Sequence, residues 1–395
     1  MDKVFELIKK EQKRQQETLM MIASENYPFP EVLSTQCSVL NNKYSEGYPD
    51  HRYYQGNKYI DEIENIAIEN AKRLFGVKFV NVQPYSGSPA NAAATMALIN
   101  PGEKIMGLKL SGGGHLTHGH PNITFSGKFF QSVQYDVNAD GWIDYQEIEK
   151  LAIQEKPKLM VIGTTAYPRT LDFEKFHKIA KKVGAYVLAD ISHIAGLVVG
   201  GVHPSPVGFA DVIMTTTHKT LRGPRGAILM TDNPELAQKI DKAVFPGLQG
   251  GPHNATTAGI AITLAHDYKD YAHQVVKNAQ VLSHELLTMN YKLTTGGTDN
   301  HLMVINIGSN AKQIATNLEE AGIIVNYNSI PHDPNPPANP SGIRLGTPAL
   351  TTRGMKEKEM KQIAKWIYEV SKDPNTTEKI AKEVKKLCKK FPIET

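Results

Sequence analysis

Two kinds of spacing alternate among the apolar positions in the middle of the chain. Three short and nearly continuous apolar runs, at residues 159–163, 186–190 and 212–215, predict strands that are buried on both faces of a sheet. Between the first two runs, apolar residues recur at helical spacing over residues 176–183, and Gly184 ends the pattern. Because a strand, a helix and a second strand follow one another at this distance, we expect the strands to pair in parallel.

The same rhythm extends toward both ends of the chain. The further predicted elements are helices at residues 60–75, 89–100 and 271–289, a strand at 104–108, a charged helix within the first 20 residues and a basic helix at the C-terminus. The helix at 89–100 has the clearest boundaries, because Ser88 can cap it, Pro89 suits its first turn, and Asn100-Pro101-Gly102 ends it. This order of elements predicts an α/β fold with a mostly parallel sheet.

Composition and charge narrow the class of protein. A chain of 395 residues with 41% hydrophobic and 21% charged residues is typical of a globular protein of about two domains. The net charge of +4 is too small to indicate nucleic-acid binding. No apolar run approaches the roughly 18 residues that span a membrane, and Cys37 and Cys388 are the only cysteines. We therefore expect a cytoplasmic protein that has no disulfide framework and binds neither nucleic acid nor membrane.

Candidate chemistry lies where the predicted strands end. Ser86-Gly87-Ser88 precedes a helix, so its free N–H groups could bind a phosphate, although a simple capped turn is the plainer interpretation. Asp190 ends an apolar strand, where its carboxylate needs a partner such as a protonated pyridine nitrogen, or caps the next helix. Lys219 follows the third strand among small and hydroxyl residues. Partial burial there would lower its pKa and permit a Schiff base, whereas the alternatives are a phosphate contact or a surface loop.

Together these three features are more specific than any one of them. A phosphate-binding turn, an acid at one strand end and a lysine at another are the parts that hold pyridoxal 5'-phosphate. They supply its phosphate anchor, its ring-nitrogen partner and its covalent attachment. The chain has no G-x-x-x-x-G-K-[ST] motif, which argues against the main nucleotide-binding alternative. The residues therefore indicate a pyridoxal-phosphate enzyme.

A series of motifs runs in order along nearly the whole chain. They are residues 22–26 (IASEN), 42–49 (NKYSEGYP), 52–56 (RYYQG), 81–91 (NVQPYSGSPAN), 113–119 (GGHLTHG), 166–169 (AYPR), 193–197 (HIAGL), 217–226 (THKTLRGPRG), 245–252 (FPGLQGGP), 297–301 (GTDNH) and 341–347 (SGIRLGT). This series resembles the serine hydroxymethyltransferase family. The resemblance implies a fold-type-I pyridoxal-phosphate transferase, with a mostly parallel seven-stranded sheet in a large domain and a smaller C-terminal α+β domain.

The resemblance also implies three groups of site residues. The catalytic residues would be Lys219, Glu46, His115, Asp190 and Tyr54. The cofactor-binding residues would be Ser86, Gly87, Ser88, His115, Thr165, Asp190, His193, His218, Lys219, Tyr44 and Gly251. The substrate-binding residues would be Ser24, Glu46, Tyr53, Tyr54, Arg344, Asn328 and Leu116. No metal ligand is expected.

Five of these residues have distinct implied tasks. Lys219 would hold the cofactor as an aldimine, Asp190 would keep its pyridine nitrogen protonated, and His115 would stack on its ring. Arg344 would bind the substrate carboxylate, because a planar guanidinium can donate hydrogen bonds to both carboxylate oxygens. Glu46 would transfer protons near the hydroxymethyl carbon.

The implied reaction is the reversible conversion of L-serine and tetrahydrofolate into glycine and 5,10-methylenetetrahydrofolate. Pyridoxal 5'-phosphate would be the cofactor, and Asn328 would contact the reduced pterin. Residues 41–54 are too polar for the core of one subunit, and Tyr44 and Gly251 would act from the neighbouring subunit, so we expect a homodimer with shared sites, or a tetramer. The expected parts of the chain are a helical arm (1–29), a large cofactor-binding domain (30–270) and a small domain (271–395).

A threonine or β-hydroxy amino acid aldolase of the same fold is the nearest alternative. It would need no pterin, and Glu46, Tyr54 and Asn328 argue against it. Residues 338–340 depart from the commoner family pattern on the pterin side, which leaves open which reduced pterin is used.

Two segments suggest a metal instead. His115, His118 and His120 are close enough in sequence to bind zinc in a metal-dependent hydrolase, which is a more remote alternative. Residues 136–147 match a calcium-binding loop at every ligand position. Such a loop needs a helix on each side, whereas residues 130–135 predict a strand, so we do not expect calcium binding.

Overall fold

The computed structural model of the chain describes residues 2–394. Its helices are α1 (Asp2–Glu17), α2 (Pro30–Gln36), α3 (Lys58–Phe75), α4 (Gly87–Leu98), α5 (Phe125–Phe129), α6 (Tyr145–Glu155), α7 (Phe173–Val183), α8 (Ala195–Val199), α9 (Pro234–Lys242), α10 (Asn254–Thr263), α11 (Lys269–Thr288), α12 (Ala311–Glu320), α13 (Pro348–Thr352), α14 (Glu357–Lys372) and α15 (Thr377–Lys390). Its strands are β1 (Leu19–Met20), β2 (Gly47–Tyr48), β3 (His51–Arg52), β4 (Phe79–Asn81), β5 (Lys104–Leu108), β6 (Gln131–Tyr135), β7 (Leu159–Gly163), β8 (Tyr186–Asp190), β9 (Val212–Thr216), β10 (Ala227–Thr231), β11 (Lys292–Leu293), β12 (Leu302–Asn306), β13 (Ile323–Ile324), β14 (Asn326–Asn328) and β15 (Gly342–Gly346).

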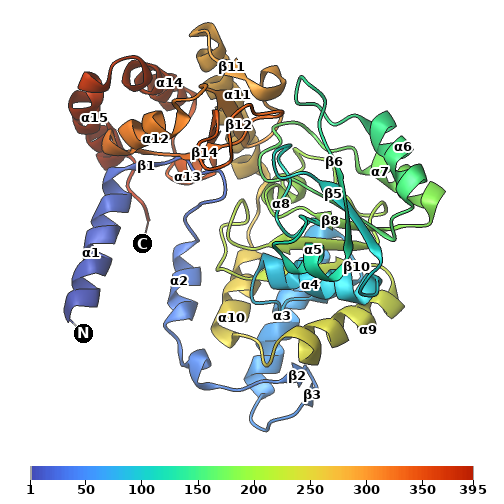
Figure 1. Ribbon diagram of the computed structural model, residues 1–395. Helices are drawn as coiled ribbons and strands as arrows, with labels where there is room; N and C mark the ends of the chain where they lie inside the picture. Colours follow the sequence, from blue (N-terminus) through green and yellow to red (C-terminus); the bar gives the residue numbers. More distant parts are fainter. Residues whose placement is uncertain (1, 395) are drawn as a thin grey trace.

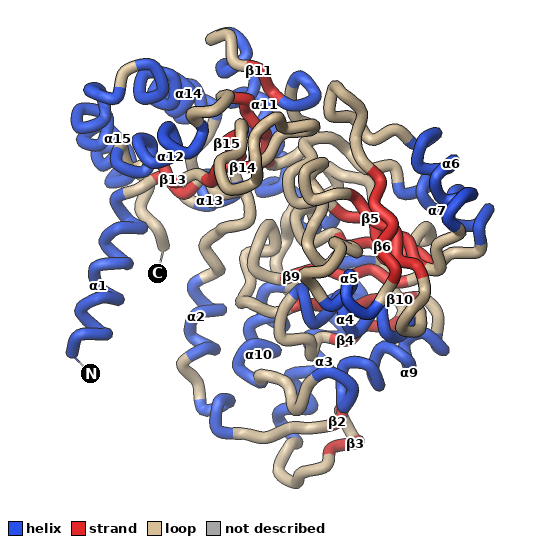
Figure 2. Tube along the Cα trace, viewed as in Figure 1, coloured by secondary structure: helices blue, strands red, loops and turns tan. Residues whose placement is uncertain are grey.

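A seven-stranded sheet lies at the centre of the larger part of the molecule, in the order β4-β10-β9-β8-β7-β5-β6. The strands from β9 to β6 pair in parallel, whereas β10 pairs antiparallel with both β9 and β4. Figure 2 shows the strands (red) gathered among the helices (blue). The expected mostly parallel seven-stranded sheet is therefore confirmed, as is the parallel pairing of β7, β8 and β9.

Both faces of this sheet are buried. Along β7, Met160 and Ile162 pack into one hydrophobic cluster, while Leu159 and Val161 pack into another. Successive side chains of a strand point to opposite faces, so the two clusters cover the two sides of the sheet. Helices α6 and α7 contribute to the first cluster, and α4 and α9 contribute to the second. This burial explains why the strands read as continuous apolar runs.

A second sheet and a separate core occupy the C-terminal part. The four-stranded sheet has the order β11-β12-β15-β14 and is antiparallel. Its core also includes Leu19 and Met21, because β1 pairs with β13. In Figure 1, α12, α14 and α15 (orange to red) lie at the upper left, above α1 and β1, and the large sheet lies to the right. Helix α11 contributes to both cores, with Val275 in one and Leu282 in the other.

These two cores support the two domains that we propose. The boundaries at residues 29 and 270 stay predictions, since α11 begins at Lys269 and joins both cores. Among the described helices, none combines the length and the apolar character needed to cross a bilayer.

One boundary predicted from the sequence is wrong. The helix expected at 89–100 is α4, which begins at Gly87 with Ser86 as its N-cap residue, so Ser88 lies inside the first turn. Pro89 is tolerated there because the first N–H groups of a helix have no partner within it. The consequence is that Ser86, Gly87 and Ser88 together form the N-terminus of the helix.

Candidate active site

A cavity of about 280 Å³ opens at the carboxyl ends of the parallel strands. Its lining consists of Ser86, Gly87, Ser88, Asn91, His115, His118, Thr164, Thr165, Asp190, Ser192, His193, Met214, Thr216, His218, Lys219 and Arg225. Ligands of open parallel sheets bind at this edge because the loops that follow the strands meet there. The structure thus brings together nine residues expected from the sequence, namely Ser86, Gly87, Ser88, His115, Thr165, Asp190, His193, His218 and Lys219.

The N-terminus of α4 forms one wall of the cavity. A Cβ atom on Gly87 would lie only 2.7 Å from Cγ2 of Thr216, so a side chain at this position would collide with the end of β9. The glycine therefore lets the helix terminus lie against the neighbouring strand. The free N–H groups and the helix dipole at such a terminus favour an anion.

Asp190 is held by three hydrogen bonds at the end of β8. Its Oδ2 atom accepts from Nδ2 of Asn91 and from Nε2 of His118, each at 2.9 Å, and its Oδ1 atom accepts from the Ser192 N–H at 3.0 Å. Burial would raise the pKa of Asp190, but the hydrogen bond and the charge of His118, together with Lys219, hold it well below its usual value. The carboxylate is therefore an ionised group in a buried site.

Lys219 lies in the connection between β9 and β10, with its main-chain oxygen bonded to Nδ2 of Asn26 at 2.9 Å. Burial lowers the pKa of the Lys219 ammonium to about 8; Asp190 opposes this effect, and Arg344 and Arg225 add to it. Near neutral pH, a lysine with such a pKa has a much larger neutral fraction than an exposed lysine, and the neutral amine is the nucleophilic form.

Three histidines of the site, His115, His193 and His218, are largely neutral. Burial, with a contribution from His118, lowers the pKa of His115 to about 4, and burial lowers that of His218 to about 3. Burial and nearby Lys219 also hold the pKa of His193 well below its usual value. His193 is bonded through Nδ1 to Nε2 of His301 at 3.2 Å. These rings can therefore stack or accept hydrogen bonds without adding positive charge.

The histidine run does not assemble as a metal centre. His118 is bonded to Asp190, whereas Nδ1 of His120 bonds the Pro121 carbonyl. In residues 2–394 there is no group of three or more His, Cys, Asp or Glu side chains that could hold a metal ion. The sequence suggests only a zinc-ligand role for His118, because its hydrogen bond with Asp190 joins residues that are 72 positions apart in the chain.

The calcium-like segment is a turn between a strand and a helix. It follows β6, as predicted, and leads into α6. Oδ1 of Asn138 accepts from the N–H groups of Asp140 and Trp142, and Oδ1 of Asp144 accepts from those of Gln146 and Glu147 as the N-cap of α6. These side chains therefore stabilise the turn and the helix.

Several expected substrate residues lie outside the Lys219 cavity. Ser24 lines an adjoining cavity of about 520 Å³, and His218 and Arg225 line both cavities. Asn328 ends β14, where Nδ2 bonds the carbonyl of Ser329. Leu116 is partly exposed beside the cavity residue His115.

The residues expected from a neighbouring subunit form a separate group in this chain. Tyr44 and Gly251 line another cavity, of about 410 Å³, and Glu46 lies close to Gly251. Tyr53 packs edge-on against Phe245, with ring centroids 5.7 Å apart, and Tyr54 packs similarly against Tyr44 at 5.5 Å. The lining of the Lys219 cavity, as the described residues define it, includes none of Tyr44, Glu46, Tyr53, Tyr54 and Gly251.

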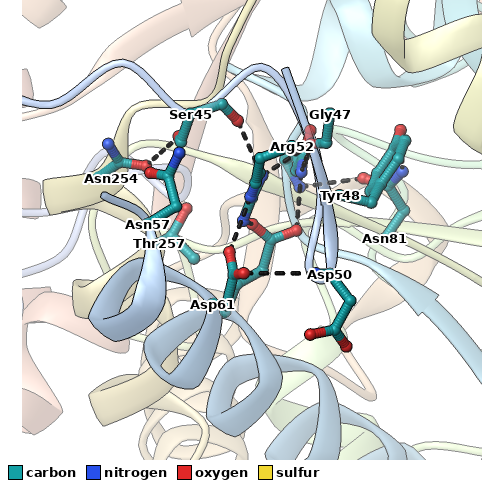
Figure 3. A network of polar contacts seen from close by, with 12 residues as sticks. Ser45, Gly47, Tyr48, Asp50, Arg52, Asn57, Asp61, Asn81, Asn254 and Thr257 are labelled. Carbon is teal, nitrogen blue, oxygen red and sulfur yellow. Dashed lines mark hydrogen bonds and ion pairs between the residues drawn. The ribbon is translucent and has the colours of Figure 1, made fainter. Parts of the chain in front are cut away.

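Arg52 organises the loop that carries these residues. Nε bonds Oδ1 of Asp61 at 2.8 Å, Nη2 bonds Oε2 of Glu64 at 2.6 Å, and Nη1 bonds the carbonyls of Ser45 and Gly47. Figure 3 shows Arg52 between the main chain of the loop and Asp61. The Arg52 and Glu64 side chains are only 4% and 2% exposed. A sequence signal for this network exists, since Asp61 and Glu64 are three residues apart and therefore lie on one face of α3.

Replacing Arg52 with alanine is expected to lower the free energy of unfolding by about 3–5 kcal/mol, because it leaves a buried carboxylate without its partner. Urea denaturation measures the change. Lys58→Ala, on the exposed start of α3, is the matched control and should change stability by less than about 0.5 kcal/mol. Equal unfolding midpoints for the two variants would contradict the role of the Arg52 network.

Comparisons with known proteins identify the family of the chain. A family model described as Serine hydroxymethyltransferase matches residues 1–367. A protein of Acidothermus cellulolyticus named "Serine hydroxymethyltransferase" is 53% identical over 98% of this chain and 95% of its own length. Proteins with the same name from Desulfotalea psychrophila and Campylobacter jejuni are each 51% identical, over 98% and 99% of this chain and 93% and 96% of their own lengths.

Proposed function

The chain belongs to the serine hydroxymethyltransferase family, and on that basis we propose that it transfers the hydroxymethyl group of L-serine reversibly to tetrahydrofolate, leaving glycine and 5,10-methylenetetrahydrofolate. The observation that carries the proposal is one cavity lined by a buried lysine of lowered pKa, a buried carboxylate and a helix N-terminus. The names of the relatives favour this reaction over a pterin-independent aldolase and over a metal-dependent hydrolase.

The cavity fits pyridoxal 5'-phosphate in its polarity. Four buried side-chain atoms of the described residues that line the cavity have no hydrogen-bond partner. They are Oδ1 of Asn91, Nδ1 of His118, Oγ1 of Thr216 and Nδ1 of His218. Buried polar atoms are usually satisfied, so such atoms point to a polar ligand. When bound, the cofactor supplies an electron sink that stabilises negative charge at the substrate α-carbon.

Each wall of the cavity would meet one part of the cofactor. The N-terminus of α4, with Ser86, Gly87 and Ser88, would bind the phosphate. Asp190 would accept a hydrogen bond from the protonated pyridine nitrogen, and Lys219 would form the covalent bond with its amine. The stacking group would be His115, which is neutral and therefore does not compete for the phosphate charge. Thr165, His193 and His218 would complete the site.

The amino acid and the pterin would be bound by residues around the cavity. Arg344 and Ser24 would bind the carboxylate, and Asn328 and Leu116 would face the reduced pterin. The pterin would be tetrahydrofolate or a related reduced pterin, since residues 338–340, which depart from the commoner family pattern, would lie on the pterin side.

The remaining residues support a homodimer with shared sites. Tyr44, Tyr53 and Tyr54 are 64%, 72% and 46% exposed in the single chain, and a group of exposed aromatic side chains on one loop is typical of an interaction surface. In the proposed assembly, Glu46 and these tyrosines enter the cavity of the partner, and Gly251 approaches the partner's phosphate site; a tetramer would pair two such dimers. Cys37 and Cys388 are free thiols, which supports a reducing, cytoplasmic setting.

The test of the proposed function is spectroscopic and chemical. The purified holoenzyme is mixed with glycine, then with glycine and tetrahydrofolate, and product formation is followed from L-serine. A long-wavelength absorption band that needs both compounds, together with pterin-dependent glycine formation, is expected. Cleavage of β-hydroxy amino acids without any response to the pterin would favour the aldolase, and a protein that stays colourless with added pyridoxal phosphate would refute the cofactor.

Covalent capture of added pyridoxal phosphate by the cofactor-free protein is expected to accelerate between about pH 7 and about pH 9. The reason is that the pKa of Lys219 is lowered to about 8, so its neutral amine dominates above that pH. Stopped-flow absorbance gives the rate at each pH. A midpoint near 10.4, the value of an exposed lysine, would show that burial does not activate this amine.

A further inference from the structure

The Arg344 guanidinium is held on two sides in the structure. Arg344 lies in the middle of β15 and is 9% exposed. Its Nε donates a hydrogen bond to Oδ1 of Asn326 at 3.0 Å, and its Nη1 donates to the main-chain oxygen of Thr165 at 2.6 Å. Asn326 and Arg344 are directly opposite each other in the antiparallel pair of β14 and β15. Opposed residues place their side chains on the same face of a sheet, which explains the first contact.

The two contacts determine which edge of the guanidinium is free. A guanidinium has five N–H donors in a rigid plane, and two of them are used here. No described residue accepts a hydrogen bond from Nη2 of Arg344. Because Nε is occupied, the edge formed by Nε and Nη2 cannot bind both oxygens of a carboxylate. The unused donors, which are the two hydrogens of Nη2 and the second hydrogen of Nη1, remain for a carboxylate.

The hydrogen bond from Nη1 of Arg344 to the Thr165 carbonyl connects this arginine to the cofactor cavity. Thr165 lines the Lys219 cavity, and its Oγ1 donates to the carbonyl of Gly114 at 2.8 Å. Gly114 directly precedes His115, another residue of the lining. The Thr165 carbonyl thus positions Arg344, which belongs to the smaller sheet, relative to the cavity at the end of the larger one.

We propose that Asn326 is a positioning residue for the amino-acid substrate, which fixes the plane of the Arg344 guanidinium so that its terminal nitrogens face the substrate carboxylate. This rests on the proposed function, in which Arg344 binds that carboxylate. An amide oxygen suits the task because it accepts the Nε hydrogen without neutralising the guanidinium charge. An aspartate in its place would pair with the guanidinium and compete with the substrate.

The test compares glycine binding and serine turnover in holoenzyme variants. Asn326→Ala should raise the Kd for glycine, measured by calorimetry, and the KM for L-serine by roughly 10- to 100-fold, with kcat changed less than about threefold and the KM for tetrahydrofolate unchanged. Tyr327→Ala removes a half-exposed side chain from the same strand and is the matched control, with glycine binding expected to match the parent protein. If the alanine variant does not fold, the isosteric Asn326→Asp should also weaken glycine binding, through competition by its charge.

Two outcomes would overturn the positioning role. One is unchanged glycine affinity in both Asn326 variants. The other is a loss of kcat and of affinity for both substrates together with a lower melting temperature, which would indicate a structural role only. Arg344→Ala separates this failure from that of the proposed function. If Arg344→Ala abolishes glycine binding while Asn326→Ala does not, only the role of Asn326 is wrong. If Arg344→Ala binds glycine normally, the carboxylate site itself lies elsewhere.

Discussion

Replacing Lys219 with glutamine is expected to lower turnover of L-serine at least about 10³-fold and to abolish covalent attachment of pyridoxal phosphate, because removing the nucleophile of a covalent mechanism costs orders of magnitude in rate. Burial lowers the pKa of Lys219 to about 8, which favours its nucleophilic form. The lining of the candidate cavity contains no second lysine among the described residues, so no other amine lies at the same place. Borohydride reduction followed by mass spectrometry of peptides locates the attachment, and steady-state assays give the rate.

An exposed lysine provides the matched control for this variant. Lys239→Gln changes the same side-chain type on the outer face of α9 and should leave both labelling and turnover as in the parent protein. Labelling of a different lysine in the parent, or turnover by the Lys219→Gln variant above a tenth of the parent rate, would contradict the assignment.

Replacing Asp190 with asparagine is expected to reduce kcat/KM by about 10²- to 10⁴-fold, the range typical for loss of a group that holds a proton at the reacting system. The substitution also turns a carboxylate into a group with an N–H₂ end, while Asn91 and His118 both donate to its Oδ2. A buried donor without an acceptor costs about 1–3 kcal/mol, so a lower unfolding midpoint should accompany the lost activity.

The pH dependence of stability offers a second readout for Asp190. The pKa of this carboxyl in the folded protein lies below its unfolded value of about 3.9. Its ionised form therefore stabilises the fold above that pH, and the contribution is lost as the pH falls toward the folded-state pKa. Asp190→Asn should lose stability at neutral pH and show a flatter dependence between about pH 5 and about pH 2. Urea midpoints across this range measure the slope.

A second aspartate serves as the control. Asp211 precedes β9 and accepts the Val187 N–H through Oδ2, away from the cavity lining. Asp211→Asn keeps an oxygen acceptor, so activity should match the parent protein and stability should change by no more than about 1 kcal/mol. Similar losses of activity in both variants would show that Asp190 acts only through general stability.

The sequence by itself determined the central sheet and the main chemical groups. The apolar runs of β7, β8 and β9 are local patterns, and burial on both faces requires them to be continuous, so their parallel pairing could be predicted. Asp190 and Lys219 could be recognised because they follow such strands directly. The family resemblance then supplied roles that no spacing rule contains, and the comparisons confirm the family itself.

Only the tertiary structure decided how the polar groups pair. His115, His118 and His120 look alike in the sequence, yet the fold turns His118 onto Asp190 and His120 onto the Pro121 carbonyl. The start of α4 at Gly87 depends on its packing against Thr216, which lies 129 residues further along the chain.

The hydrogen-bond partners of Arg344 and Arg52 also could not be predicted from the sequence. Its contacts with Asn326 and Thr165 span 18 and 179 residues, and those of Arg52 join a loop to one face of α3. Hydrogen bonds of this kind form between groups that are brought together by strand register and helix packing, so their partners have no signature in the local pattern of apolar and polar residues. The sequence therefore determines which groups are available, and the packing of the two sheets decides which of them meet.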